Sequence, residues 1–334
     1  MARPTDEFLV AWESLVGDST QDGWRSIPVA PGGSCQLMAA RRFPGNGESL
    51  LAHFPSVNIP VAEKLPEGRG FTIERVDPHG DGKTWLALTR NESGSIELFV
   101  AMVGDVVGVM DTEAASGEER LLTIFLRRVR AWQEFMRKGI QGLEPEAEIG
   151  LIGELSFLAA MLDAGIPASL AVESWVGPLD GIQDFEVGTG AVEVKATLSA
   201  TGFPAKIGSL EQLDDSIRQP LFLTGVRLSQ TASGRNLPEF AEHVRGLLNG
   251  DAEAQRLFAD RLLVAGFFDA HADRYVRRFA ILSTRVVEVG EGFPRLTHGT
   301  VQNGIRKAKY EIDFDRATGE NLGPIGAFKK LGVL

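Results

Sequence analysis

The stretch GPLDGIQDFEVGTGAVEVKAT at residues 177–197 decides how the second half of this chain folds and where its chemistry lies. Apolar and charged residues alternate with a period of two on both sides of a glycine-containing turn, which predicts the two strands of a hairpin. The apolar members of the pattern are Phe185, Val187, Val192 and Val194, and the charged members are Asp184, Glu186, Glu193 and Lys195. We expect the apolar set to point into the core and the charged set to gather on one face.

The register of this hairpin depends on the length of its loop. A two-residue loop formed by Thr189-Gly190 would place Asp184 opposite Lys195. The same loop would place Glu186 opposite Glu193. A loop of three residues would instead set the charged residues of one strand against the apolar residues of the other. Only a loop with an even number of residues keeps the charged side chains together.

Two carboxylates that face each other across neighbouring strands repel, so a cation is expected to compensate them. Mg²⁺ is suited to this role because it binds hard oxygen ligands, commonly one or two carboxylates together with phosphate oxygens and water. Lys195 lies two residues after Glu193 and shares its face. Its ammonium group can stabilise phosphate charge or orient a water nucleophile. This combination of groups is suited to the hydrolysis of phosphodiester bonds.

The order of Asp184, a hairpin turn and then Glu193-Val194-Lys195 resembles the motif of the PD-(D/E)XK nuclease superfamily. The preceding run at 150–165 is similar to the helix that comes before the core in the restriction-endonuclease-like and Mrr-like members. Glu154 is the counterpart of the acidic residue in that helix, which often helps to hold metal. The resemblance thus rests on three acidic residues and one lysine in a fixed order.

The whole chain, with a long part before this motif and the segment IGSLEQL at 207–213 after it, resembles a bacterial family of PD-(D/E)XK members. The resemblance implies a catalytic set of Asp184, Glu193, Lys195 and Glu154, whose three carboxylates hold Mg²⁺ or Mn²⁺. It implies an α/β (α+β overall) fold with a restriction-endonuclease-like mixed sheet flanked by helices. The implied activity is that of a Mg²⁺-dependent DNA endonuclease of restriction or phage-defence type.

Two assignments near the motif stay open. Pro178 comes two residues before Asp180 and not beside Asp184, so Asp180 competes for the role of the metal-binding aspartate. Asp184 is favoured because it lies in a strand-like run, whereas Asp180 and the glycine that follows it are typical of a turn. Gln212, near the start of an expected helix, either contacts the site or serves packing or solvent exposure.

The chain has 334 residues, of which 43% are hydrophobic, and is long enough for two globular domains. It contains no run of about eighteen apolar residues of the kind that spans a membrane. Its first residues lack the basic-then-apolar pattern of a signal peptide, so we expect a cytoplasmic location. The single cysteine, Cys35, excludes an intramolecular disulfide and is interpreted as a small, partly buried hydrophobic residue.

The net charge of -11 weighs against nucleic-acid binding, which draws most of its affinity from Lys and Arg. Local basic groups nevertheless occur. They are Arg120, Arg127, Arg128, Arg130, Arg137 and Lys138, then Arg274, Arg277 and Arg278, and near the end Arg306, Lys307 and Lys309. Each group alone is typical of a solvated face or a helix end, and together they allow a basic groove.

The character of the sequence changes near Gly117, which predicts a β-rich domain at 1–117 and a nuclease-like domain at 118–334. Turn residues separate short β-like runs in the first domain and indicate an antiparallel sheet. These runs are 36–40, 71–76, 85–89, 96–103 and 106–110.

Helical spacing of apolar residues predicts helices in the second domain, and β-like runs predict the strands between them. The expected helices are 118–138, 145–165, 237–248 and 251–265, and the expected strands beyond the hairpin are 221–228, 275–282, 286–289 and 308–314. The last strand could pack on either domain, including the N-terminal one.

Other chemistries have little support in the sequence. The histidines never occur at zinc-binding i, i+4 spacing, and neither a phosphate-binding loop nor a serine nucleophile motif is present. The alternative to an endonuclease is a catalytically silent nuclease-fold subunit that binds DNA or serves assembly in a defence system. Such a subunit would work with a methyltransferase or helicase partner. DNA is the expected ligand in both cases, a homodimer is a further option, and no membrane partner is expected.

Overall fold

The computed structural model describes residues 6–18, 20–32, 34–57, 64–68, 70–138, 142–179 and 181–334. The chain forms two compact units, Met1–Ile140 and Gln141–Leu334. The boundary expected near Gly117 differs from this division, since helix α3 (Glu118–Lys138) belongs to the first unit. The guanidinium of Arg128 in this helix donates to both carboxylate oxygens of Asp105, at 2.6 and 2.7 Å, and fixes α3 to the preceding helix.

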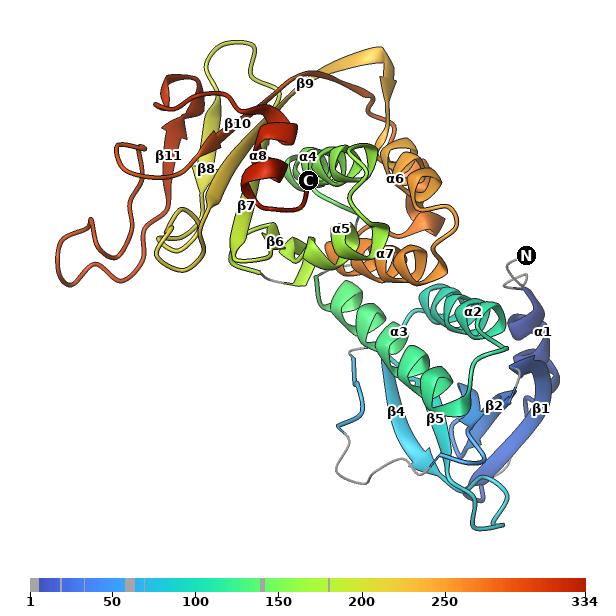
Figure 1. Ribbon diagram of the computed structural model, residues 1–334. Coiled ribbons are helices and arrows are strands. Elements are labelled where there is room, and N and C mark those ends of the chain that lie inside the picture. The colour runs from blue at the N-terminus through green and yellow to red at the C-terminus, as the bar shows by residue number, and fades with distance from the viewer. Residues whose placement is uncertain are drawn as a thin grey trace. The chain divides into compact units, whose positions relative to one another are not determined.

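The first unit contains a five-stranded antiparallel sheet with the order β1-β2-β3-β5-β4 (Figure 1). Its strands are β1 (Gly23–Gly32), β2 (Cys35–Phe43), β3 (Gly47–His53), β4 (Phe71–Val76) and β5 (Trp85–Arg90). Helices α1 (Asp6–Ser14) and α2 (Ile96–Thr112) contact strand β1, and α3 packs on α2. The pairing is antiparallel as expected, whereas β1 and β3 are strands that the sequence patterns did not indicate.

The segments 96–103 and 106–110, expected to be strands, form the single helix α2. The Ser95 hydroxyl caps this helix by accepting a hydrogen bond from the Leu98 amide at 3.3 Å, and Glu97 lies in its first turn. The buried residues of α2 recur at helical spacing: Phe99, Val100, Met102, Val103, Val106, Val107 and Met110. Its many valines suggested strands, but the cap and the packing on the sheet favour a helix.

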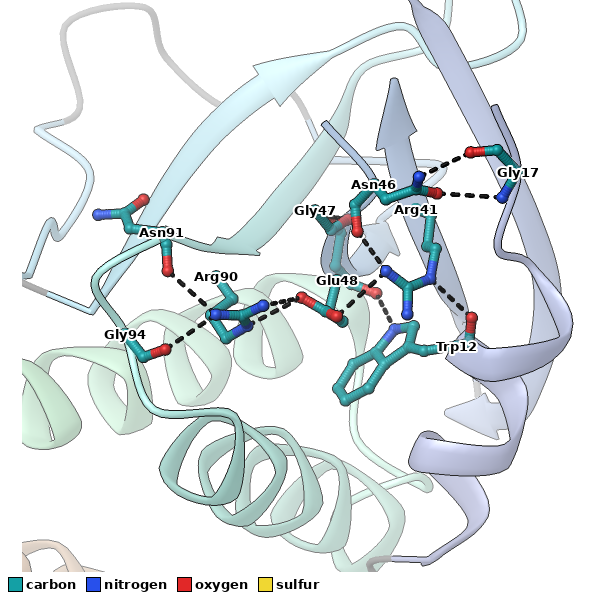
Figure 2. Close-up of polar contacts among 10 residues, drawn as sticks. Trp12, Gly17, Arg41, Asn46, Gly47, Glu48, Arg90, Asn91 and Gly94 are labelled. Atoms are coloured by element: carbon teal, nitrogen blue, oxygen red, sulfur yellow. Dashed lines mark hydrogen bonds and ion pairs between the residues drawn. The ribbon is translucent and has the colours of Figure 1, made fainter. Parts of the chain in front are cut away.

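A buried ion network links strands β2, β3 and β5 of the first unit (Figure 2). Glu48 lies between two arginines, with Arg41 Nη1 at 3.1 Å and Arg90 Nη2 at 2.7 Å. Arg41 Nε also donates to the carbonyl of Trp12 at 2.7 Å, and Arg90 Nη1 to that of Gly94 at 2.9 Å. These bonds tie helix α1 and the turn before α2 to the sheet, and each charge of the network has partners.

The second unit has a four-stranded mixed sheet with the order β10-β9-β7-β6 and a two-stranded sheet, β11-β8 (Figure 1). The strands are β6 (Phe185–Val187), β7 (Gly190–Thr197), β8 (Pro204–Ile207), β9 (Leu221–Arg235), β10 (Phe279–Glu288) and β11 (Tyr310–Asp313). The helices are α4 (Pro145–Asp163), α5 (Ala168–Ser174), α6 (Leu237–Leu247), α7 (Ala252–Ala265) and α8 (Gly323–Lys330). Strand β7 pairs with β9 in parallel and with β6 antiparallel. The predicted mixed α/β class is confirmed.

Helix α4 packs closely against the central strand β7. A Cβ atom on Gly153 of the helix would lie 3.0 Å from Cβ of Ala196 and 3.5 Å from Cγ1 of Val194. Further along the helix, the Phe157 ring lies 4.9 Å from the ring of Phe185 in β6. This close approach places Glu154, the residue after Gly153, beside the charged residues of β7. Helix α4 contributes to the candidate active site in this way.

Several sequence predictions for the second unit need correction. The runs 275–282 and 286–289 contribute to one strand, β10, whose pairing with β9 is interrupted by a bulge between Ile281 and Ser283. The last strand, β11, pairs with β8 and thus belongs to the second unit, not to the N-terminal domain. Gln212, placed in an expected helix, lies in a segment of turns and bends.

No helix in the described ranges combines the length and the apolar character needed to cross a membrane. Cys35 is more buried than expected, with 2% of its surface exposed, and this burial raises the pKa of its thiol to about 12. A thiol in this environment stays protonated, which agrees with the interpretation of Cys35 as a buried hydrophobic residue.

Candidate active site

The hairpin has a two-residue loop, but one residue earlier than expected. Val187 pairs with Gly190 and Phe185 with Val192, so the loop consists of Gly188 and Thr189. The backbone of Gly188 has a φ of +59°, which a hairpin loop of this length needs and which glycine adopts without strain. The predicted register was wrong by two positions, yet the even length keeps the charged residues on one face.

The new register changes which residues meet. Glu186 pairs with Ala191 and not with Glu193, and its carboxylate forms an ion pair with Arg218. Asp184, just before β6, accepts a hydrogen bond from the Val194 amide at 2.7 Å and is not opposite Lys195. Glu186 therefore leaves the acidic cluster, while Asp184 is held against β7.

All four predicted site residues line one pocket of about 410 Å³. Glu154 comes from α4, Asp184 from the residue before β6, and Glu193 and Lys195 from β7. The carboxylate of Glu193 is deepest, with 1% of the residue exposed, whereas the other three are partly buried. Asp180, the competing aspartate, lies outside the described residues.

Each carboxylate of the pocket makes a different contact. Glu193 Oε1 accepts from Lys195 Nζ at 2.5 Å, and Glu154 Oε2 accepts from the indole Nε1 of Trp175 at 2.7 Å. Glu193 Oε2 is buried and has no hydrogen-bond partner among the described residues. A buried carboxylate oxygen without a partner is costly, so this atom indicates a site that accepts a further cation or donor.

The electrostatics of the pocket show an excess of negative charge. Burial, together with repulsion from Asp184, raises the pKa of Glu154 and of Glu193 to about 8 each. Burial also raises the pKa of Asp184, against the opposing effects of Lys195 and the Val194 amide. Burial by itself would lower the pKa of Lys195, but the three carboxylates outweigh it and raise that pKa. One lysine does not neutralise three ionised carboxylates, so a further cation in the pocket would favour their ionised forms.

The donor chemistry of the pocket fits Mg²⁺ or Mn²⁺. Both ions take hard oxygen ligands, and the unpartnered Oε2 of Glu193 and the carboxylate of Asp184 supply them. Within the described ranges, no group of three or more His, Cys, Asp or Glu is arranged to hold a metal as it stands.

Two residues that support the site were missed from the sequence. Trp175, fully buried, holds Glu154 through its indole N–H, and Gly177 lies directly beside two of the carboxylates. A Cβ atom on Gly177 would lie 2.9 Å from Asp184 Oδ1 and 3.2 Å from Glu154 Oε2. Gly177 is the first residue of the stretch that fixes the hairpin, but only the fold shows that its missing side chain makes space for the carboxylates.

The remaining polar lining includes Glu146, Lys206, Gln212 and Glu311. Lys206 Nζ forms an exposed ion pair with Glu146 at 3.1 Å, and Gln212 Oε1 accepts from the Gly208 amide at 2.7 Å. Gln212 thus contacts the pocket, one of the two alternatives left open by the sequence. Lys206 and Glu311 are cross-strand partners in β8 and β11, so the two-stranded sheet forms one side of the pocket.

The family described as "Putative PD-(D/E)XK family member, (DUF4420)" matches residues 9–315. The chain belongs to this family, and its mixed α/β fold is consistent with a PD-(D/E)XK nuclease-like core. The match confirms the family resemblance drawn from the sequence. Comparison with curated proteins and with solved structures gives no match.

Proposed function

We propose that this protein is a Mg²⁺-dependent DNA endonuclease of restriction or phage-defence type. The observation that carries the proposal is the convergence of Glu154, Asp184, Glu193 and Lys195 on one pocket, with Glu193 Oε2 unpartnered. This arrangement supports phosphodiester hydrolysis, because such chemistry needs hard oxygen ligands and a cation beside the phosphate.

Asp184 and Glu193 would hold Mg²⁺ or Mn²⁺, and Glu154 would serve as an auxiliary ligand. A metal ion bound there would supply Lewis-acid polarisation of the phosphate and a water with a lowered pKa. Trp175 positions Glu154, and the Val194 amide positions Asp184, so both carboxylates are held before substrate arrives.

Lys195 would stabilise the negative charge that develops on the phosphate. Its ammonium now contacts Glu193, and its side chain is 20% exposed, so it remains accessible from the pocket. A cation acting on charge that forms during the reaction mainly accelerates the chemical step, not substrate binding.

The contact between Lys195 and Glu193 also favours a second candidate, the catalytically silent DNA-binding or assembly subunit. In that protein the lysine would serve as a permanent counter-ion for Glu193 and would exclude metal. Its methyltransferase or helicase partner would then supply the activity. The two candidates differ in two measurable properties, the binding of a divalent metal and the cleavage of DNA.

A plasmid cleavage time course with Mg²⁺ and with Mn²⁺, on modified and unmodified DNA, tests the proposal. We expect nicking or cutting by the wild type, none by Asp184→Ala, and wild-type rates for the control Glu186→Ala, whose carboxylate pairs with Arg218 outside the pocket. If the wild type cuts neither DNA, alone or with candidate partner proteins, the silent subunit replaces the endonuclease.

A further inference from the structure

The segment between Glu291 and Glu311 is basic in an acidic chain. It contains no acidic residue, whereas it has Arg295, Arg306, Lys307 and Lys309, and the whole chain carries a net charge of -11. It leads from the end of β10 into β11, and in Figure 1 it is drawn in orange-red beside β11 and β8. A local excess of positive charge of this kind attracts polyanions even when the net charge is negative.

The structure separates the three cations at the end of this segment from the other basic groups of the sequence, whereas Arg295 is itself ion-paired with Asp215 at 2.9 Å. In those groups, arginines are neutralised by acidic neighbours: Arg128 by Asp105, Arg137 by Glu134, Arg277 by Glu148 and Arg278 by Glu239. The exposed side chains of Arg306, Lys307 and Lys309 form no ion pair and no hydrogen bond within the described residues. Their charges are therefore available to a ligand.

The segment is anchored next to the pocket. Arg295 Nη1 donates to the carbonyl of Leu213 at 2.9 Å, directly after the pocket residue Gln212. The imidazole Nε2 of His298 lies 2.8 Å from Glu211 Oε1. At the other end, Lys309 precedes by two residues the pocket residue Glu311, which pairs with Lys206 across the sheet β8–β11. Both ends of the basic segment thus lie next to residues that line the pocket.

The pocket itself needs such a neighbour if its substrate is a polyanion. When ionised, Glu154, Asp184 and Glu193 repel phosphate groups, and the rim cation Lys206 is paired with Glu146. Lys and Arg that neutralise phosphates release counter-ions and supply most of the sequence-independent affinity for DNA. Three unpaired cations in a segment anchored at this pocket would supply contacts to phosphates that flank the one entering it.

We infer that Arg306, Lys307 and Lys309 bind the phosphodiester backbone of a DNA duplex and position it at the pocket, an inference that rests on the proposed nuclease function. The three side chains contact phosphates and carry no sequence information, so they would bind all DNA sequences alike. Gln302 and Asn303, also exposed in this segment, add uncharged hydrogen-bonding groups next to them.

The test compares Arg306→Gln/Lys307→Gln/Lys309→Gln with a control that removes two cations elsewhere, Arg235→Gln/Lys329→Gln. The control removes two other exposed cations of the second unit that have no partner within the described ranges. Both sets are placed in a Lys195→Ala background to slow cleavage, and fluorescence anisotropy follows binding with Mg²⁺ at several salt concentrations. The probes are a labelled DNA duplex, its single strand and an RNA duplex of the same sequence.

We expect the triple variant to bind the DNA duplex roughly tenfold or more weakly than its background, and the control to bind as the background does. The slope of log affinity against log salt should fall by about 3, roughly 1 for each lost phosphate contact. An unchanged affinity and slope would overturn the inference. A loss confined to single strands or RNA, or a background protein that binds none of the probes, would overturn it as well.

These outcomes separate the inference from the proposed function. If the otherwise wild-type protein fails to cleave DNA while the triple substitution still weakens duplex binding, the backbone contact stands and the endonuclease does not. If the wild type cleaves DNA and the triple variant binds DNA as its background does, the endonuclease stands and the backbone contact does not.

Discussion

Each unit of this protein buries a cluster of charged residues, and the two clusters are built in opposite ways. In the first unit Glu48 is shared by Arg41 and Arg90, and both arginines also donate to backbone carbonyls (Figure 2). In the second unit three carboxylates share one lysine, and Glu193 Oε2 has no partner among the described residues. The first cluster is fully paired, and the second is short of positive charge.

The difference shows how burial of the same residue types serves structure in one place and function in another. Complete pairing makes a buried charge tolerable and fixes local geometry without leaving a group to react. Incomplete pairing shifts pKa values and leaves ligand atoms available, which is typical of functional sites. The pKa of about 8 for both Glu154 and Glu193 places the second cluster in that class.

Asp184→Asn should produce the largest effect on the second cluster. We expect metal-dependent cleavage to fall by more than about three powers of ten, because loss of a ligand exceeds the loss of a single stabilising donor. The stabilisation of the wild type by Mg²⁺, measured as a rise in the midpoint of thermal unfolding, should be largely lost too. A variant that still cleaves at the wild-type rate would remove Asp184 from the site.

Lys195→Ala should lower the cleavage rate by about two to four powers of ten while leaving DNA affinity nearly unchanged. The reason is that its ammonium acts on charge that develops in the chemical step. Single-turnover cleavage and anisotropy, run beside Lys206→Ala at the rim of the same pocket, separate the two effects. Equal losses of cleavage rate in both variants would mean that Lys195 has no role in the chemical step beyond that of any other cation near the pocket.

Glu48→Gln tests the fully paired cluster. The substitution leaves Arg41 and Arg90 without their shared carboxylate, and we expect the first unit to lose about 3–5 kcal/mol of unfolding free energy. Urea denaturation measures this loss. The Mg²⁺-induced stabilisation of the second unit should stay as in the wild type, and a variant that loses this response would contradict the separation of the two roles.

Glu154→Gln should have the smallest effect, and it should be stabilising without metal. The folded pKa of Glu154, about 8, lies above its ordinary value of 4.5, so its contribution to stability is present below pH 4.5 and is lost as the pH rises through 8. Between pH 6 and 9 the metal-free wild type should therefore lose stability, and the variant should lose less. We expect its unfolding midpoint at pH 8.5 to be higher by roughly 2–4 °C.

The matched control for this measurement is Glu146→Gln, an exposed carboxylate that lines the same pocket. It should show the pH dependence of the wild type. If Glu146→Gln flattens the pH profile as strongly as Glu154→Gln does, the pH effect comes from the general charge of the pocket and not from the buried cluster.

Sequence patterns predicted some parts of the molecule well and failed on others for identifiable reasons. Alternation gave the strands of the hairpin because side-chain direction follows a period of two, and helical spacing gave α3, α4, α6 and α7. The run that became α2 was assigned to strands because its many valines favour strands, although its buried positions recur at helical spacing. Strands β1 and β3 lacked a pattern that indicated them.

The sequence by itself determined the order of Glu154, Asp184, Glu193 and Lys195, and with it the family, because residue type and spacing along one hairpin are local properties. Only the tertiary structure decided that the loop lies at Gly188-Thr189 and that Glu186 forms an ion pair with Arg218 outside the pocket. It also decided that Trp175 binds Glu154 and that Gly177 makes space for the carboxylates. It also decided which cations are free, since neutralisation of an arginine depends on an acidic residue that is distant in sequence. Local chemistry can be read along the chain, whereas pairing and burial depend on contacts that exist only after folding.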